Sequence, residues 1–272
     1  MLRVVVLGAA AGGGVPQWNC GCAGCRAARA NSQELQRTQA SVAFSADGAH
    51  WFLINASPDL RQQFNATPQL HPKPGALRHT PIAGVILTNG EVDAVAGLLS
   101  MREGSPFTIY AHDKVLAILK ANSIFNVLNE KNVRRQPMGI DEPFEPRLPD
   151  GSRSGIEVVA FEVPGKSAWY LEGKAHPGGN DGAALVFFDG TVWQDDEMIK
   201  AGLGHKTGKS MGHVAMSGHD GAIARLADLT LDRKMFLHIN NLNPALLPSS
   251  PERNAAEQAG WQIPADGTEI VL

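Results

Sequence analysis

The chain has 272 residues, with 24 Lys and Arg against 27 Asp and Glu, so its formal net charge is −3. Hydrophobic residues make up 43 % and charged residues 19 %, an ordinary globular composition that excludes a disordered tail, a collagen and a strongly basic nucleic-acid binder. The apolar runs have the length of strands, so we expect no insertion into a membrane. The first apolar run leads directly into a glycine-rich turn and is interpreted as a strand rather than a signal peptide.

Strands and helices alternate along the chain, which indicates α/β layers. No repeat, low-complexity tract or long linker divides the sequence, so we predict a single domain over residues 1–272. In chain order, we predict a strand over 4–7, a helix over 26–36, strands over 41–44 and 51–54, a helix from 60 to 64, a strand over 82–87, a helix over 95–99, a strand over 107–110, a helix over 114–122, strands over 156–163 and 183–188, a helix over 221–229, a strand over 234–239, a helix over 252–259 and a strand over 269–272.

The three cysteines all fall within six residues. An odd, clustered set is a poor disulfide framework; it suits a reducing cytoplasm, where such clusters are more often metal sites. Cys20, Cys22 and Cys25 therefore predict a structural zinc site, although zinc takes four ligands in such sites and the fourth must come from elsewhere in the chain. The alternative is a loop with three reduced thiols.

Four of the predicted strands end in polar clusters, and ligands of α/β proteins lie beyond the carboxyl ends of strands. If the four strands are neighbours, their acidic and imidazole groups converge, and these groups would repel one another unless a cation lay among them. This predicts a metal site suited to iron, manganese or zinc. Taken singly, each residue is equally interpreted as the cap of a helix or turn. The converging groups are Asp59, Glu91, Asp93, Asp189 and His238.

Several stretches of the chain resemble the family of pyrroloquinoline quinone (PQQ) biosynthesis protein B, within the metallo-β-lactamase-fold superfamily. They extend from the first residues to about residue 241. The resemblance implies an α/β fold (α+β in some schemes), the αββα sandwich, with the active site at one edge. The stretches are Leu7–Cys22, Arg37–Ser41, Leu53–Arg61, Gly97–Gly104, Asp189–Thr191, Asp195–Ile199, Met211–His213 and His238–Asn241.

The resemblance implies an Fe(II)- and O2-dependent hydroxylase that acts on the tyrosine ring of a cross-linked Glu–Tyr unit derived from a small precursor peptide. Two alternatives remain: a non-catalytic carrier of PQQ or its precursor with a role in transport, and a metal-dependent hydrolase, the commonest chemistry of the fold. The expected partners are the Glu–Tyr precursor, other PQQ biosynthesis proteins and a second copy of the chain in a homodimer, with no nucleic acid. The expected location is the bacterial cytoplasm.

The signature T-H-x-H-x-D-H loop of the superfamily corresponds here to Thr88–Ala94. Its first two histidines are replaced by Asn89 and Glu91, Asp93 is retained, and Ala94 stands where the family keeps a histidine. Alanine has no donor atom, so the resemblance implies a weakened metal site. The implied ligands of the active-site metal, Fe(II) or Zn or Mn in its place, are Glu91, Asp93, Asp189 and His238, with His213 nearby.

The resemblance also implies roles for individual side chains. A two-histidine, one-carboxylate iron site is one hypothesis for His213, His238 and Asp93. In the other, His213 orients the substrate or donates a proton. His213 and Asp93 are the implied catalytic pair. By analogy with relatives in the fold, the fourth zinc ligand comes from the segment after His238, where Asn241 is a candidate.

The candidate substrate-binding residues are Arg37, Asn55, Ser57 and Arg61, the two arginines because a guanidinium binds carboxylates in a bidentate way. Ordinary structural pairing is the alternative for both arginines. The chain also departs from the family near residues 170–182, where a strand pair is expected. Either a hairpin has been lost or a segment is missing from the numbering; the second is favoured because unpaired strand edges are a liability.

Overall fold

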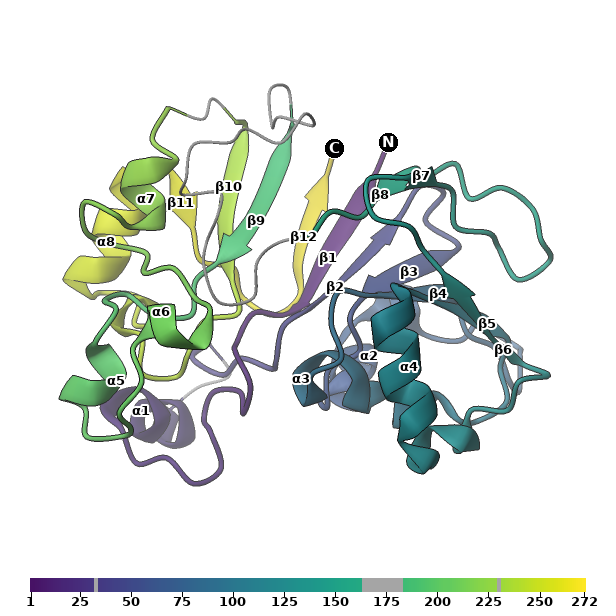
Figure 1. Ribbon diagram of the computed structural model, residues 1–272, viewed down its shortest axis with the longest axis horizontal. Helices are drawn as coiled ribbons and strands as arrows, with labels where there is room; N and C mark the ends of the chain where they lie inside the picture. Colours follow the sequence, from purple (N-terminus) through teal and green to yellow (C-terminus); the bar gives the residue numbers. More distant parts are fainter. Residues whose placement is uncertain (32–33, 163–182, 229–230) are drawn as a thin grey trace. The chain divides into compact units, whose positions relative to one another are not determined.

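The computed structural model describes residues 1–31, 34–162, 183–228 and 231–272. The chain divides into two compact units (Figure 1). Unit 1 comprises residues 1–8, 38–162 and 266–272, and unit 2 comprises residues 9–37 and 163–265. The predicted shortening near 170–182 lies outside the described residues.

Unit 1 is built on a seven-stranded mixed sheet with the order β12-β1-β2-β3-β4-β5-β6. The strands from β12 to β3 pair antiparallel, and those from β3 to β6 pair parallel. The change of direction follows from the connections, because β2 and β3 form a hairpin whereas helices link the later strands. The strands are β1 (Arg3–Gly8), β2 (Ser41–Ser45), β3 (Trp51–Ile54), β4 (Ile82–Leu87), β5 (Phe107–Ala111), β6 (Val133–Pro137) and β12 (Thr268–Val271).

The parallel part of this sheet is covered by helices and forms the core of unit 1. Every residue of β4 and β5 is buried, as expected for parallel strands covered on both faces. A small antiparallel pair, β7 (Pro143–Phe144) with β8 (Val158–Val159), also belongs to this unit. The helices are α2 (Leu60–Ala66), α3 (Val92–Val95) and α4 (Asp113–Ala121), with 3-10 helices η1 (Pro68–Leu70), η2 (Ala96–Met101) and η3 (Ser123–Val127).

Unit 2 contains a three-stranded parallel sheet with the order β11-β10-β9. A separate apolar core fills it, in which the ring of Trp261 stacks on Phe236 with 4.1 Å between centroids. The strands are β9 (Leu185–Asp189), β10 (Arg233–Leu237) and β11 (Trp261–Gln262), and the helices are α1 (Ala23–Asn31), α5 (Glu197–Lys200), α6 (Gly208–Met211), α7 (Ala222–Arg225), η5 (Pro244–Leu246) and α8 (Pro251–Gln258).

Some predicted elements differ from the observed ones. The helix predicted over 26–36 begins earlier, at Ala23, because the carbonyl of Cys22 accepts the amide of Arg26 and starts the first turn. The strand predicted over 156–163 is wrong for most of its described part, since only the two residues of β8 are paired there. The four strands with polar ends do not form one row, because β3 and β4 lie in one sheet and β9 and β10 in the other.

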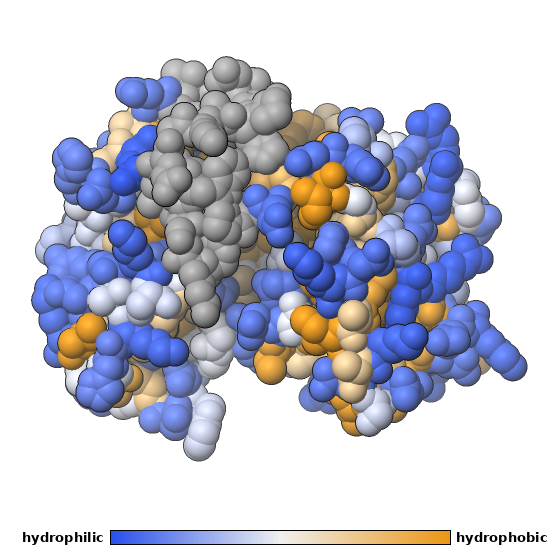
Figure 2. Space-filling model, viewed as in Figure 1, coloured by the Kyte–Doolittle hydropathy of each residue, from blue (hydrophilic) through white to orange (hydrophobic). Residues whose placement is uncertain are grey.

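The surface agrees with the near-neutral composition. Figure 2 shows a face on which hydrophilic residues predominate, with hydrophobic residues scattered among them. On α4 and η3, Ile118, Ile124 and Val127 are exposed. Among the described residues, no helix has the length and apolarity that a membrane span would require.

Candidate metal centres

Two neighbouring strands of unit 2 place an aspartate beside a histidine. Asp189 is the last residue of β9 and lies in register with Leu237, the last residue of β10. His238 follows immediately, and parallel strands end at the same edge of a sheet. The connection is tight: the amide of Gly190 donates to the Leu237 carbonyl at 2.7 Å, and a Cβ on Gly190 would lie 2.9 Å from Cβ of Phe236. Only glycine fits this close approach.

A second histidine reaches the same place from α6. That helix ends at Gly212, whose φ of 95° is left-handed, and the amide of His213 then donates to the Gly208 carbonyl at 2.9 Å. His213 Nδ1 lies 3.1 Å from Asp189 Oδ2. The rings of His213 and His238 are stacked, with 5.4 Å between their centroids.

Asp189, His213 and His238 form a compact cluster, with one ligand atom from each lying within 4.8 Å of the others. Burial raises the pKa of Asp189, but hydrogen bonds with the two histidines and Thr191, and the charge of His213, outweigh this effect. They hold the pKa of the carboxyl well below its usual range. The three side chains remain about a quarter to a third exposed, so a small ligand can reach an ionised carboxylate between two imidazoles.

Thr191 is the residue of this cluster to which the sequence gave no role. Its Oγ1 lies 2.6 Å from Asp189 Oδ1, 3.0 Å from His213 Nδ1 and 2.9 Å from His238 Nδ1. It stands two positions after the aspartate at the end of a strand, a spacing that puts both side chains on one face, and this is the signal that could have found it. His238 itself has a φ of 58°, a strained conformation for a non-glycine residue and one that clusters at functional sites.

The three cysteines also come together, in the loop that leads into α1. Each sulfur accepts a backbone amide: Cys20 from Cys22 at 3.4 Å, Cys22 from Cys25 at 3.3 Å, and Cys25 from Gln17 at 3.3 Å. Arg29 fixes the loop from the helix, since its guanidinium donates to the carbonyl of Cys20 at 2.6 Å. Amide donors and a nearby cation both favour thiolates over thiols.

Asn241 faces all three sulfurs. Its Nδ2 lies 3.1, 3.7 and 3.4 Å from the sulfurs of Cys20, Cys22 and Cys25, and its main-chain oxygen lies 3.5 Å from the Cys22 sulfur. Burial tends to raise the pKa of Cys22, but hydrogen bonds from Cys25, Cys20 and Asn241 lower it. Burial and the neighbouring Cys22 raise the pKa of Cys25 to about 11. One thiolate thus suppresses another, and a cation is needed to ionise all three.

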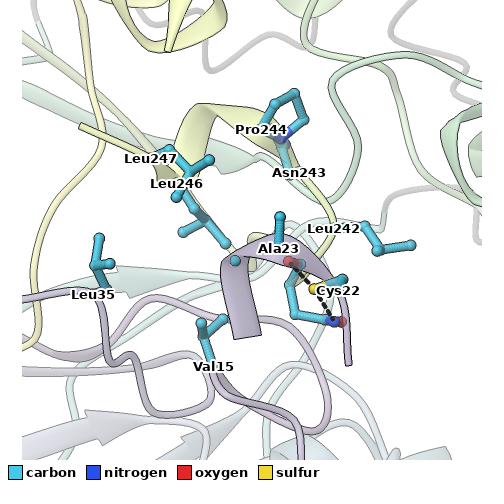
Figure 3. A pocket seen from close by; sticks show the side chains of 11 residues that line it. Val15, Cys22, Ala23, Leu35, Leu242, Asn243, Pro244, Leu246 and Leu247 are labelled. Carbon is cyan, nitrogen blue, oxygen red and sulfur yellow. Dashed lines mark hydrogen bonds between the residues drawn. The ribbon is translucent and has the colours of Figure 1, made fainter. Parts of the chain in front are cut away.

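A cavity of about 260 Å³ adjoins this cluster (Figure 3). Its walls are mostly apolar, and Cys22 and Asn241 lie at one side, joined by their hydrogen bond. The amide of Asn243, another lining residue, is occupied, because its Nδ2 donates to the Gly190 carbonyl at 2.9 Å and its Oδ1 accepts the amide of Ala245. The lining residues are Val15, Cys22, Ala23, Gly24, Leu35, Asn241, Leu242, Asn243, Pro244, Leu246 and Leu247.

The predicted carboxylate ligands of unit 1 lie at the start of α3. Glu91 is exposed and precedes the helix, and Asp93 lies in its first turn. Ala94 is 2 % exposed and packs in the core of unit 1, where its carbonyl accepts the amide of Ala56 at 2.7 Å. The position that carries a histidine in the family therefore contributes only packing and main-chain bonds here.

The four candidate substrate-binding residues have different surroundings. Arg37, in unit 2, is buried and donates to the carbonyls of Pro264, Glu34 and Gln36. In unit 1, Ser57 is fully buried and donates to Gln63, whereas Arg61 is exposed on α2. The structure thus gives Arg37 and Ser57 internal bonds that stabilise their loops, and their substrate contacts stay a prediction.

Asn55 joins the ends of β3 and β4. Its φ is 61°, and its Oδ1 accepts the amide of Thr88 at 2.9 Å while its Nδ2 donates to the Thr88 hydroxyl at 2.9 Å. Asp59, from the same cluster, makes no capping bond to α2; its carboxylate accepts the amide and side chain of Gln39 instead. Asn55 therefore fixes the loop from which Glu91 and Asp93 follow.

We expect Asn55→Ala to lower the free energy of unfolding by about 2 kcal/mol, because it removes two hydrogen bonds and places a Cβ in the left-handed region without compensation. Asn55→Gly removes the same bonds but tolerates the backbone, so it should be the milder change by roughly 1 kcal/mol. Urea unfolding of both variants checks this order. Equal losses, or a larger loss for glycine, would contradict the role of the positive φ.

Comparisons with known proteins give a consistent result. A beta-lactamase superfamily domain model matches residues 50–180. The chain is 78 % identical to coenzyme PQQ synthesis protein B of Bradyrhizobium diazoefficiens and 68 % identical to that of Rhodopseudomonas palustris, each over 100 % of both chains. Both alignments extend over 309 positions, whereas this chain has 272 residues, so the relatives hold residues for which this chain has no counterpart.

Solved structures agree with these relatives. The crystal structure of Zn²⁺-bound PqqB from Methylobacterium extorquens matches with a TM-score of 0.90 and 45 % identity, over 99 % of this chain and 100 % of that one. A diphosphatase of the PhnP family matches with a TM-score of 0.66 and 20 % identity, over 100 % of this chain and 98 % of that one, a likeness of fold alone.

Proposed function

Because this chain belongs to the family of coenzyme PQQ synthesis protein B, and so serves PQQ biosynthesis, we propose that it is an Fe(II)- and O2-dependent hydroxylase. The proposed substrate is the tyrosine ring of a cross-linked Glu–Tyr precursor. The observation that carries the proposal is the two-histidine, one-carboxylate set of unit 2. The predicted fold class, the metallo-β-lactamase-like αββα sandwich, is confirmed by the domain model and the solved relative.

The donor set of this cluster fits iron. Asp189, His213 and His238 offer one carboxylate and two imidazoles, the combination typical of non-haem Fe(II) oxygenases, and no cysteine contributes to this set of described residues. The lowered pKa of Asp189 keeps the carboxyl ionised near neutral pH, as a metal ligand must be. When bound, Fe(II) supplies activation of O2 for insertion of one oxygen atom into the aromatic ring.

The chain's own residues orient and hold these donors. Asp189 bonds to Thr191 and His213, which fixes the carboxylate at the end of β9. His238 is held by the ladder that continues past β10, since the amide of Asn240 donates to the Thr191 carbonyl at 3.1 Å. In the proposal, Glu91 and Asp93 of unit 1 remain candidate ligands or acid–base groups for the same reaction.

A structural zinc is the second part of the proposal. Cys20, Cys22 and Cys25 supply three thiolates with amide donors to each, and Asn241 is the polar side chain that faces all of them. Asn241 would complete the four ligands through its amide oxygen. The Zn²⁺-bound relative from Methylobacterium extorquens supports zinc as a metal of this family. The zinc supplies no chemistry in the reaction and stabilises the loop before α1.

The test of the proposed function is O2 consumption by Fe(II)-loaded protein with the Glu–Tyr precursor and a chemical reductant. Hydroxylation places one oxygen atom of O2 in the ring, and the other leaves as water with two electrons from the reductant and two protons. We expect the product to gain one ¹⁸O atom from ¹⁸O2. Tight binding of the precursor without O2 use would instead indicate a carrier, and phosphodiester turnover with Mn(II) would indicate a hydrolase.

A further inference from the structure

The hydroxyl of Thr191 lies among the polar atoms of Asp189, His213 and His238. Its Oγ1 is within 3.0 Å of one carboxylate oxygen, one nitrogen of each imidazole and the carbonyl of His238. Thr191 is 3 % exposed, so these contacts are made inside the protein. Each of them needs a proton between its two heavy atoms, and a hydroxyl has one proton and two lone pairs.

The hydroxyl proton belongs on the side of Asp189. The contact with Asp189 Oδ1 is the shortest of the four, at 2.6 Å, which is the length of a hydroxyl bonded to a carboxylate. If the proton pointed to an imidazole instead, two acceptor oxygens would face each other at that distance. The His238 carbonyl, an acceptor at 3.0 Å, shares the same proton.

The lone pairs of Oγ1 then face the two imidazoles, so Nδ1 of each ring must be the donor. A neutral imidazole has a single N–H, which leaves the lone pair on Nε2. We propose that Thr191 is a positioning residue that fixes both His213 and His238 as the Nδ1–H tautomer and so presents both Nε2 atoms to a metal ion. Only the identity of that metal rests on the proposed function, because the tautomers belong to the metal-free protein.

The two rings depend on Thr191 to different degrees. His213 Nδ1 has a second acceptor in Asp189 Oδ2 at 3.1 Å, whereas His238 Nδ1 lies 3.6 Å from Asp189 Oδ1. Removal of the hydroxyl should therefore change the tautomer of His238 more than that of His213. Metal affinity should fall by about 10–100-fold, as for other partners that orient a ligand.

The experiment is ring-¹⁵N NMR of metal-free protein labelled at histidine, at a pH where the imidazoles are neutral. His213→Gln and His238→Gln identify the two sets of signals. We expect protonated-type Nδ1 and unprotonated-type Nε2 signals from both rings. In Thr191→Val the His238 signals should move toward the Nε2–H pattern, and Thr191→Ser, which keeps the hydroxyl, should restore them. Ser217→Ala is the matched control, since its hydroxyl in the same unit bonds only to the Trp193 carbonyl among the contacts described.

An Nε2–H signal from either ring of the unchanged protein would overturn the proposal, as would unchanged His238 signals in a folded Thr191→Val. If that variant does not fold, the spectra of the unchanged protein and of Thr191→Ser decide. Zn²⁺ titration gives the second readout, and equal affinity in the valine and serine variants would also overturn it. Nδ1–H on both rings in a protein that takes up no Fe(II) would uphold the tautomers and refute the proposed iron.

Discussion

Replacing Asp189 with asparagine is expected to lower the affinity of the unit 2 cluster for Fe(II) by about a hundredfold or more, since it removes the only anionic ligand of the set. The amide also disturbs the remaining ligands. Asp189 now accepts from Thr191 and His213, and an NH₂ group in its place would face one of these donors. Both effects act on the same three side chains, so the loss should exceed that of the valine variant of Thr191.

The measurement is anaerobic equilibrium dialysis against Fe(II), with iron and zinc determined separately per chain. Iron should be lost and zinc retained, because the thiol cluster is a different set of residues. Asp220→Asn is the matched control: it removes an exposed carboxylate of the same unit that pairs with Arg225. Unchanged iron affinity in the Asp189 variant would place the iron elsewhere.

Replacing Cys22 with serine is expected to remove zinc from the chain and to destabilise unit 2 by several kcal/mol, since structural zinc contributes roughly 10–16 kcal/mol of apparent binding free energy in small zinc domains. Cys22 is central to the cluster, because its sulfur accepts the Cys25 amide and its thiol bonds to the Asn241 carbonyl. A serine hydroxyl is a poor zinc ligand, so three donors remain where four are needed.

Zinc content and melting temperature, with and without a chelator, test this expectation. The chelator should lower the melting temperature of the unchanged protein toward that of the Cys22→Ser variant and should leave the variant unaffected. This comparison separates loss of the metal from loss of the side chain's packing. Unchanged zinc content and melting temperature in the variant would refute the zinc site and leave a loop of reduced thiols.

The sequence was informative where a local pattern determines the structure. The β-branched run of 82–87 and the apolar run of 107–110 predict buried strands, and both are buried parallel strands of unit 1. The spacing of the cysteines likewise predicts one cluster, because all three lie in one short loop. Polar residues after a strand predict a site, and Asp189 with His238 confirms that parallel neighbours bring such residues together.

What failed depends on contacts that are distant in the sequence. The pairing of β3 with β4 and of β9 with β10, in separate sheets, is set by the packing of two cores and not by any residue near the strand ends. Asn241 meets sulfurs about 220 positions away, and only the return of β10 beside the loop of unit 2 brings it there. Thr191 was passed over because a lone threonine in a turn has many ordinary explanations.

The stretch from His238 to Asn241 serves both clusters. His238 belongs to the imidazole pair, Asn241 bonds to the thiols, and Ile239 between them is fixed by its amide to the Ala9 carbonyl at 2.9 Å. The two centres are thus four residues apart on one pinned length of backbone. Oxidation of the cysteines by by-products of O2 chemistry would loosen the anchor of His238, so this fold makes the iron site vulnerable to its own co-substrate.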